Sequence, residues 1–181
     1  VAREIDRMGE LGVDVLNLSL GCYTVDDEPP ADITGALARL DAGTVVVACA
    51  GNHGTTKPFF PAALPDVVAV GALTDDLALA AFSNHGPWVD VGVPAVDVRS
   101  TFLVGDGPRP ASLCGYDPDD FDGWAHWTGT SFAAPQVAGE IAARMTADQV
   151  PAREALGRLL GAGPRAAERP LRLRRDLGAP T

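Results

Sequence analysis

The sequence predicts an α/β fold built on a mainly parallel sheet. Two amphipathic segments near the start of the chain are each followed by an apolar run of strand length, an alternation typical of parallel sheets. With 181 residues, of which 46% are hydrophobic and 21% charged, the chain can bury the core of one domain. This composition excludes disordered and fibrous proteins, and no apolar run approaches the roughly 18 residues that a membrane-spanning helix needs.

Residues 1–21 make up the first cycle of helix and strand. The apolar residues of its first half recur at helical spacing: Val1, Ile5, Met8 and Leu11. Gly12 is a residue type that commonly ends a helix, so we expect a helix up to this point. The run VDVLNLSLG at 13–21 is apolar at most positions and predicts a strand that is mostly buried.

The rest of the chain continues the alternation. A helical segment begins at Pro29 and Pro30 and ends at Gly43, and a buried strand then begins at Thr44. Later elements are expected as strands at 66–72, 88–93 and 97–102 and as helices at 131–145 and 152–160. The segment between Leu103 and Trp124 is rich in Gly, Pro and Asp without hydrophobic periodicity, which predicts a surface loop.

The net charge and the cysteine content limit the binding partners and the disulfide bonds that can be expected. The formal net charge of −10 repels phosphate backbones and anionic lipid, so neither nucleic acid nor a membrane is an expected partner. Three cysteines cannot all pair with one another, and their spacing matches no zinc pattern. Cys49 lies in the apolar run VVVACA and is expected to be a buried free thiol, which leaves Cys22 with Cys114 as the one pair to consider.

Ser131 is the first candidate for chemistry. It follows Gly129 and Thr130 at a predicted helix N-terminus, where its hydroxyl and the first free backbone N–H groups share a small volume. Such a place suits a nucleophile beside an oxyanion site, although an N-cap serine is the commoner role for this pattern. A G-x-S-x-G elbow is absent because Ala133 holds its last position.

Asn52 and the histidines allow both a chemical and a structural interpretation. Asn52 follows a buried strand, where its amide could donate to an oxyanion, but a turn-forming Asn between two glycines is the commoner case. The chain has three histidines, all in loop-like sequence: His53, His85 and His126. An exposed histidine without a chemical role is the usual case there. The acidic stretch 117–122 departs from calcium-loop spacing and predicts a solvated loop without a metal.

Four stretches in one order resemble the subtilisin-like serine proteases, the S8 peptidases. They are VDVLNLSLG at 13–21, VVVACAGNHG at 45–54, FPAALPDVVAVGAL at 60–73 and the highly specific GTSFAAPQVAG at 129–139. FSNHGPWVDVGVP at 82–94 fits as well, and the similarity covers residues 1–146. The resemblance implies a three-layer αβα fold with a mainly parallel sheet, and a serine-type endopeptidase activity that hydrolyses peptide bonds.

The same resemblance implies roles for individual residues. Ser131 would be the acylating nucleophile, and Asn52 with the Ser131 backbone N–H would form the oxyanion hole. An extended polypeptide substrate would pair with the edge at 19–21. The substrate-binding residues would be Ser19, Leu20, Gly21, Cys49, Ala50, Gly51 and Phe59. None of these carries a carboxylate, so we expect the substrate residue before the scissile bond to be small or apolar. The resemblance also implies that the Phe60–Pro61 bond is cis.

The chain departs from the family pattern at the other two triad positions. In the family an Asp and a His precede the SLG strand, but only 18 residues precede Ser19 here and none of them is a histidine. We therefore interpret residues 1–146 as the C-terminal portion of a catalytic domain that is incomplete at its N-terminus, followed by a short helix and an Arg-rich tail at 147–181. The missing N-terminal segment, carrying the triad Asp and His, becomes an expected partner.

The resemblance also bears on cofactors, localisation and alternatives. No cofactor is expected, although structural calcium occurs in the family, and its members are mostly secreted. A non-catalytic peptide-binding pseudoprotease would keep the edge at 19–21 but would need neither Asn52 nor Ser131, so the presence of both favours the enzyme. A nucleotide-binding α/β domain would need a glycine-rich phosphate loop that the sequence lacks.

Overall fold

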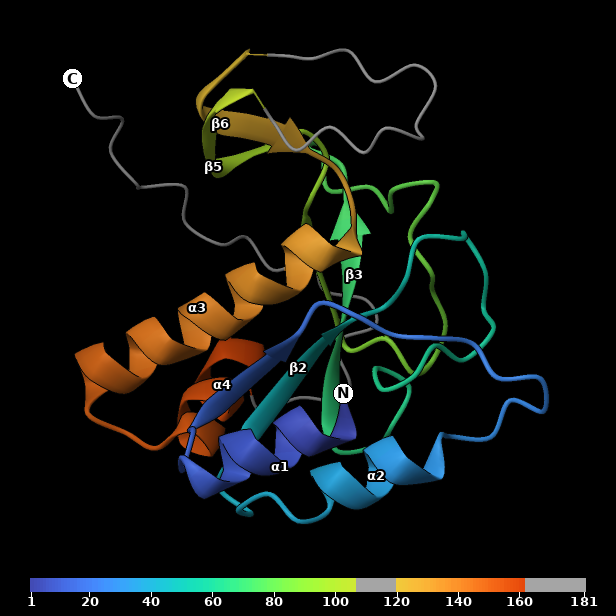
Figure 1. The fold of residues 1–181 in the computed structure, drawn as a ribbon, viewed down its shortest axis with the longest axis vertical. Coiled ribbons are helices and arrows are strands. Elements are labelled where there is room, and N and C mark those ends of the chain that lie inside the picture. The colour runs from blue at the N-terminus through green and yellow to red at the C-terminus, as the bar shows by residue number, and fades with distance from the viewer. Residues whose placement is uncertain (107–119, 162–181) are drawn as a thin grey trace.

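A four-stranded sheet forms the centre of the structure (Figure 1). The computed structural model describes residues 1–106 and 120–161. The strands of the sheet are β1 (Val15–Leu18), β2 (Val45–Cys49), β3 (Val67–Leu73) and β4 (Val91–Pro94). They lie in the order β1-β2-β3-β4, and each neighbouring pair is parallel. The expectation of a mainly parallel sheet is confirmed.

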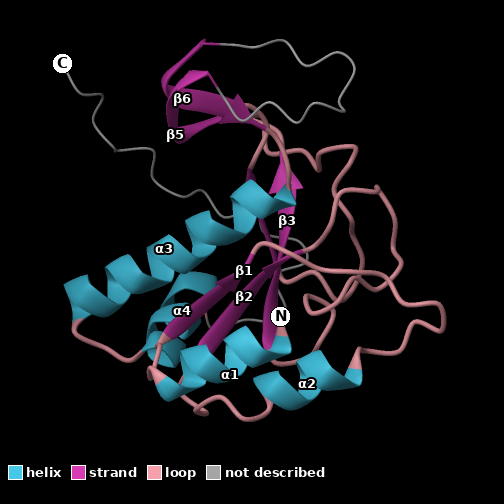
Figure 2. Cartoon of the chain, viewed as in Figure 1, coloured by secondary structure: helices cyan, strands magenta, loops and turns pink. Residues whose placement is uncertain are grey.

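Helices cover both faces of this sheet (Figure 2). One face carries α1 (Ala2–Glu10) and α2 (Ala31–Leu37), and the other carries α3 (Thr130–Asp148) and α4 (Ala152–Leu160). The three-layer αβα arrangement is therefore present, and the last helix has the bounds that the sequence predicted. None of the described helices is long and apolar enough to cross a membrane.

The two central strands are buried along their whole length, because each face of the sheet is covered. Every residue of β2 and of β3 is buried. Along β2, Val45 and Val47 face the core under α3 and α4, whereas Val46 and Ala48 face the core under α1 and α2. This two-sided burial explains why the sequence shows a continuous apolar run instead of alternation.

The longest helix, α3, packs closely on the sheet through small and branched side chains. Ala133, Ala134, Val137 and Ile141 are all fully buried in the core that α3 shares with β2, β3 and β4. The two alanines near its N-terminus let the helix backbone approach the strands. The first turn of α3 therefore lies against the sheet, next to the carboxyl ends of the strands.

A two-stranded antiparallel hairpin corrects the loop prediction at the two ends of the segment between Leu103 and Trp124. Its strands are β5 (Val98–Asp106), which includes most of the strand expected at 97–102, and β6 (Asp120–Trp127). The hairpin is held by cross-strand pairing outside the main sheet, and Val104 and Trp127 are more than half exposed, so no pattern of burial marked the second strand or the extension of the first. Cys114, Asp117 and the Arg-rich tail lie outside the described residues.

Replacement of Ile141 by Ala is expected to lower the free energy of unfolding by about 2–5 kcal/mol, because it removes a fully buried side chain between α3 and the sheet. Urea unfolding followed by circular dichroism measures the change. Thr146→Ala, at an exposed position of the same helix, is the control and should change stability by about 0.5 kcal/mol at most. Equal losses in the two variants would contradict the packing of α3 on the sheet.

Candidate active site

Ser131 lies where the end of β1 meets the first turn of α3. Its Oγ is 3.5 Å from the carbonyl oxygen of Ser19, to which it donates, and Ser19 Oγ donates back to the Ser131 carbonyl at 2.9 Å. Asn17 Nδ2 in turn donates to Ser19 Oγ at 3.0 Å. Two segments 112 residues apart are thereby joined, with the Ser131 side chain only partly buried.

Thr130 joins the same helix end to the loop after β2. Its buried hydroxyl donates to Asn52 Oδ1 at 2.8 Å and accepts from the Gly51 N–H at 3.0 Å, and its backbone N–H donates to Asn52 Oδ1 at 2.9 Å. Because Asn52 Oδ1 is held by two donors, Nδ2 of the same amide remains as a donor on an exposed side chain. The arrangement places an amide N–H beside the N-terminus of α3, where the Ser131 N–H has no intrahelical partner.

The Asn84 side chain holds the loop after β2 in place. Neither Asn84 nor Thr130 was predicted from the sequence to have a role in the site. The Asn84 side chain is fully buried and donates from Nδ2 to the Ala50 carbonyl at 2.7 Å. Its Oδ1 accepts from the backbone N–H of His53 at 3.1 Å and of Thr55 at 3.3 Å. The only sequence signal was its place in FSNHGP, since an asparagine in a loop segment gives no sign that it is buried.

Cys49 is a free thiol buried under the site, as the sequence predicted. Burial raises the pKa of this thiol, and the nearby hydroxyls of Ser131 and Thr130 act in the opposite direction. Its side chain therefore contributes to the packing below Ser131. Cys22 is exposed and free, and its suggested partner Cys114 is not among the described residues.

The structure describes all three histidines, and each of them has contacts away from Ser131. His126 Nδ1 lies 3.0 Å from Asp97 Oδ1 on the exposed hairpin, and His85 Nδ1 lies 3.4 Å from the Ser83 carbonyl. His53 contacts the Tyr23 ring. None of them forms a hydrogen bond with Ser131. The hydrogen bond of the Ser131 hydroxyl is therefore with the backbone carbonyl of Ser19 and not with an imidazole.

The remaining predicted residues lie beside the same site. The segment at 19–21 follows β1, Cys49 ends β2 and the segment at 50–52 follows it, and Phe59 lies between the two segments. The Phe60–Pro61 peptide bond is cis, which confirms the expectation. In the part of the chain that the structure describes, no three His, Cys, Asp or Glu residues are grouped to hold a metal ion.

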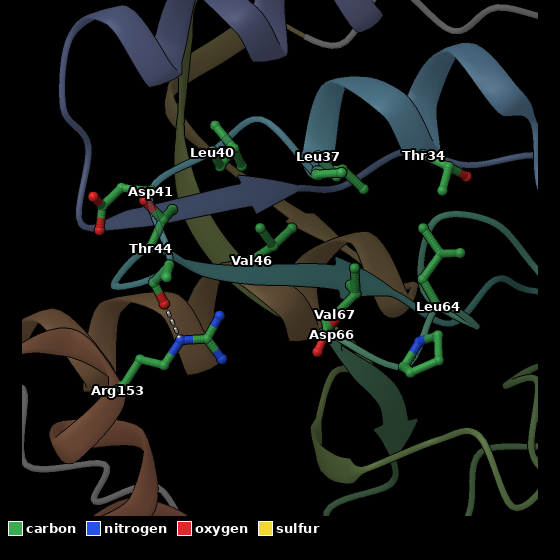
Figure 3. A pocket seen from close by; sticks show the side chains of 13 residues that line it. Thr34, Leu37, Leu40, Asp41, Thr44, Val46, Leu64, Asp66, Val67 and Arg153 are labelled. Carbon is green, nitrogen blue, oxygen red and sulfur yellow. Dashed lines mark hydrogen bonds between the residues drawn. The ribbon is translucent and has the colours of Figure 1, made fainter.

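A cavity of about 420 Å³ lies at the other end of the sheet (Figure 3). Its lining includes Val46 and Val67, near the starts of β2 and β3, and Arg153 of α4, whose Nε donates to the Ala42 carbonyl at 2.6 Å. Ser131 and Asn52 follow the carboxyl ends of the strands instead. The cavity is therefore separate from the candidate active site.

Comparisons with known proteins agree with this geometry. The profile of the Subtilase family (Peptidase S8) matches residues 1–157. The chain is 39% identical over 141 residues to a thermophilic serine proteinase of Bacillus sp. strain AK1, covering 77% of this chain and 30% of that protein. It is 33% identical over 142 residues to subtilisin BL of Lederbergia lenta, covering 78% of this chain and 45% of that protein. The chain thus spans less than half the length of either relative.

A solved structure extends the likeness to three dimensions. The prenylagaramide maturation protease PagA is similar with a TM-score of 0.67 and 25% sequence identity, over 90% of this chain and 57% of that one. The likeness therefore includes almost all of this chain and little more than half of the solved protein.

Thr130→Ala is expected to destabilise the protein by about 1–3 kcal/mol, because it leaves the buried Gly51 N–H without an acceptor. Urea unfolding measures the loss. Thr130→Ser keeps the hydroxyl and should restore most of the stability. If the serine variant is as unstable as the alanine variant, the methyl group and not the hydrogen bonds explains the role of Thr130.

Cys49 is expected to react slowly with a thiol reagent in the native protein, because it is buried and its raised pKa lowers the thiolate fraction. A Cys22→Ser, Cys114→Ser variant isolates this thiol for labelling with an aromatic disulfide, before and after unfolding in guanidinium chloride. A Cys49→Ala, Cys114→Ser variant leaves the exposed Cys22 as the fast-reacting control. Equal native rates in the two variants would contradict the burial of Cys49.

Proposed function

This chain belongs to the subtilase family, and we propose that it is the C-terminal part of the catalytic domain of a serine-type endopeptidase. One observation carries the proposal: Thr130, the residue before Ser131 at the N-terminus of α3, orients the Asn52 amide with two hydrogen bonds. A nucleophile next to two N–H donors is the arrangement that acyl transfer requires.

In the proposed mechanism Ser131 Oγ attacks the carbonyl carbon of a peptide bond. The oxyanion that forms accepts hydrogen bonds from Asn52 Nδ2 and the Ser131 N–H, and collapse of the intermediate releases the amine and leaves an acyl-enzyme ester on Ser131. Water then hydrolyses the ester. The chemistry uses protein groups alone and takes polypeptides as substrates.

The proton of the Ser131 hydroxyl needs a base that this chain does not supply. We propose that a histidine oriented by an aspartate, both on an N-terminal segment missing from this chain, takes this proton and later gives it to the leaving amine. Loss of the base from such a triad lowers kcat by about 10⁶. Residues 1–181 by themselves are therefore expected to be almost inactive.

The edge of β1 is evidence for where the N-terminal segment would bind. Leu16 and Leu18 are buried, yet β1 pairs only with β2 among the described strands. An edge strand with buried side chains offers its backbone groups to another strand, and a chain that lacks the partner strand tends to self-associate. We propose that the N-terminal segment pairs with this edge and that the complete protein is secreted, as most members of the family are.

The second candidate function is a non-catalytic peptide-binding pseudoprotease. The observation that favours it is the absence of a hydrogen bond between Ser131 and any of the three histidines, all of which the structure describes. Such a module would bind an extended polypeptide along residues 19–21 without cleaving it. The two functions differ in whether an Asp and a His accompany this chain.

Fluorophosphonate labelling of Ser131 separates these functions. Residues 1–181 are expected to label slowly and to elute as oligomers in size-exclusion chromatography. The protein encoded with its upstream segment should label rapidly and stoichiometrically, with Ser131→Ala as the unlabelled control. Failure of that longer protein to label would support the pseudoprotease.

Rapid labelling of a monomeric 1–181 chain would contradict the missing base. It would mean that a histidine of this chain serves in its place, and His126→Ala would then test the pair that His126 forms with Asp97.

A further inference from the structure

The segments that follow β1 and β2 lie on the two sides of the Phe59 ring, next to Ser131. The last residues that pair across these strands are Leu18 and Ala48. We call the space between residues 19–21 and residues 50–52 the slot, and these two segments its walls. A substrate carbonyl placed at Ser131 with its oxygen toward Asn52 would point the side chain on its acyl side into this slot.

The ring of Phe59 fills that slot. A Cβ atom built on Gly21 would lie 2.3 Å from Phe59 Cε1 and 2.8 Å from Cδ1, and one built on Gly51 would lie 3.1 Å from Cδ1. The ring is therefore in contact with the backbone of both walls at once. Only glycine at position 21 allows this approach, since any side chain there would overlap the ring.

The ring is fixed by its neighbours and is not a freely moving flap. The Tyr23 ring packs against it edge to face, with centroids 4.9 Å apart. The Tyr23 hydroxyl accepts a hydrogen bond of 2.7 Å from the buried Asn84 Nδ2, which also holds the Ala50 carbonyl of the opposite wall. The neighbouring backbone is tied as well, because Cys22 and Phe60 exchange two hydrogen bonds of 2.9 Å.

We propose that Phe59 closes the floor of this subsite and limits the residue before the scissile bond to Gly or Ala. A larger side chain would have to displace a ring that Tyr23 and the two glycine walls hold in place. The inference deepens the proposed peptidase function and rests on it. Apolar subsites that differ by a few carbon atoms discriminate between substrates by about 10- to 200-fold.

A binding experiment tests the subsite without requiring catalysis. The protein with its upstream segment, carrying Ser131→Ala, is titrated with two N-acetylated peptides, Ala-Ala-Pro-Ala and Ala-Ala-Pro-Phe, each with a free carboxylate. Isothermal titration calorimetry is expected to show at least about 10-fold tighter binding of the peptide that ends in Ala. Equal affinities, tighter binding of the peptide that ends in Phe, or no binding of either would overturn the proposal.

Substitution of Phe59 tests whether this residue causes the preference for Ala. Phe59→Ala in the same background should remove the preference and allow the Phe-ended peptide to bind at least about 10-fold more tightly than before. Phe102→Ala, which deletes an aromatic ring from the hairpin, is the matched control and should leave both affinities unchanged. If circular dichroism shows that Phe59→Ala does not fold, Phe59→Leu takes its place. A preference that persists in the folded Phe59 variant would overturn the proposal.

Kinetics separate this inference from the proposed function. With Ser131 intact, the specificity constant kcat/KM for peptide anilides should favour Ala over Phe before the scissile bond, and Phe59→Ala should remove that preference. Selective binding without hydrolysis would support the subsite and overturn the peptidase. Hydrolysis with a preference for Phe in the unchanged protein would support the peptidase and overturn the role of Phe59.

Discussion

The hydrogen bonds of the Thr130 hydroxyl hold the candidate site together. This one group joins the first turn of α3 to the loop after β2, because it donates to Asn52 and accepts from Gly51. The position of Ser131 follows from the helix, and the orientation of the Asn52 amide follows from the hydroxyl. The hydroxyl is buried, so water does not compete for these bonds and the geometry is well defined.

The sheet makes this junction possible. Two central strands buried on both faces end at the same edge, and a helix with alanines at its start packs directly against them. The buried Asn84 side chain then fixes the loop that leaves β2, because it bonds to the Ala50 carbonyl and the His53 N–H. The packed apolar core thus holds the polar groups of the site in fixed positions. Hydrogen-bond donors can stabilise developing charge only when they are held in this way.

The same frame sets what the Ser131 side chain contacts. Its hydroxyl donates to the backbone carbonyl of Ser19 and forms no hydrogen bond with a histidine. The exposed His126 and Asp97 pair shows that an oriented imidazole is present in the chain, on the hairpin and not bonded to Ser131. Under the proposed function, the base that Ser131 needs reaches it from the side of the β1 edge, which pairs with no other described strand.

Much of the fold and part of the site could be predicted from the sequence by itself. Continuous apolar runs report strands buried on two faces, so the parallel sheet and the buried Cys49 followed from local pattern. The place of Ser131 at a helix N-terminus was visible as well, because caps and glycines mark helix ends. The second strand of the hairpin was missed, since a ribbon exposed on its surface carries little periodic signal.

Only the tertiary structure decided which side chains meet at the site. The roles of Thr130 and Asn84 depend on contacts with residues tens of positions away, and nothing in the local sequence distinguishes a buried asparagine from one in an exposed turn. The sequence placed Phe59 near the subsite, but its contact with Gly21 and Gly51 required the packing of three separate segments. Local pattern reports burial and periodicity along one segment, whereas a site is made by distances between segments, and these are set only when the whole core packs.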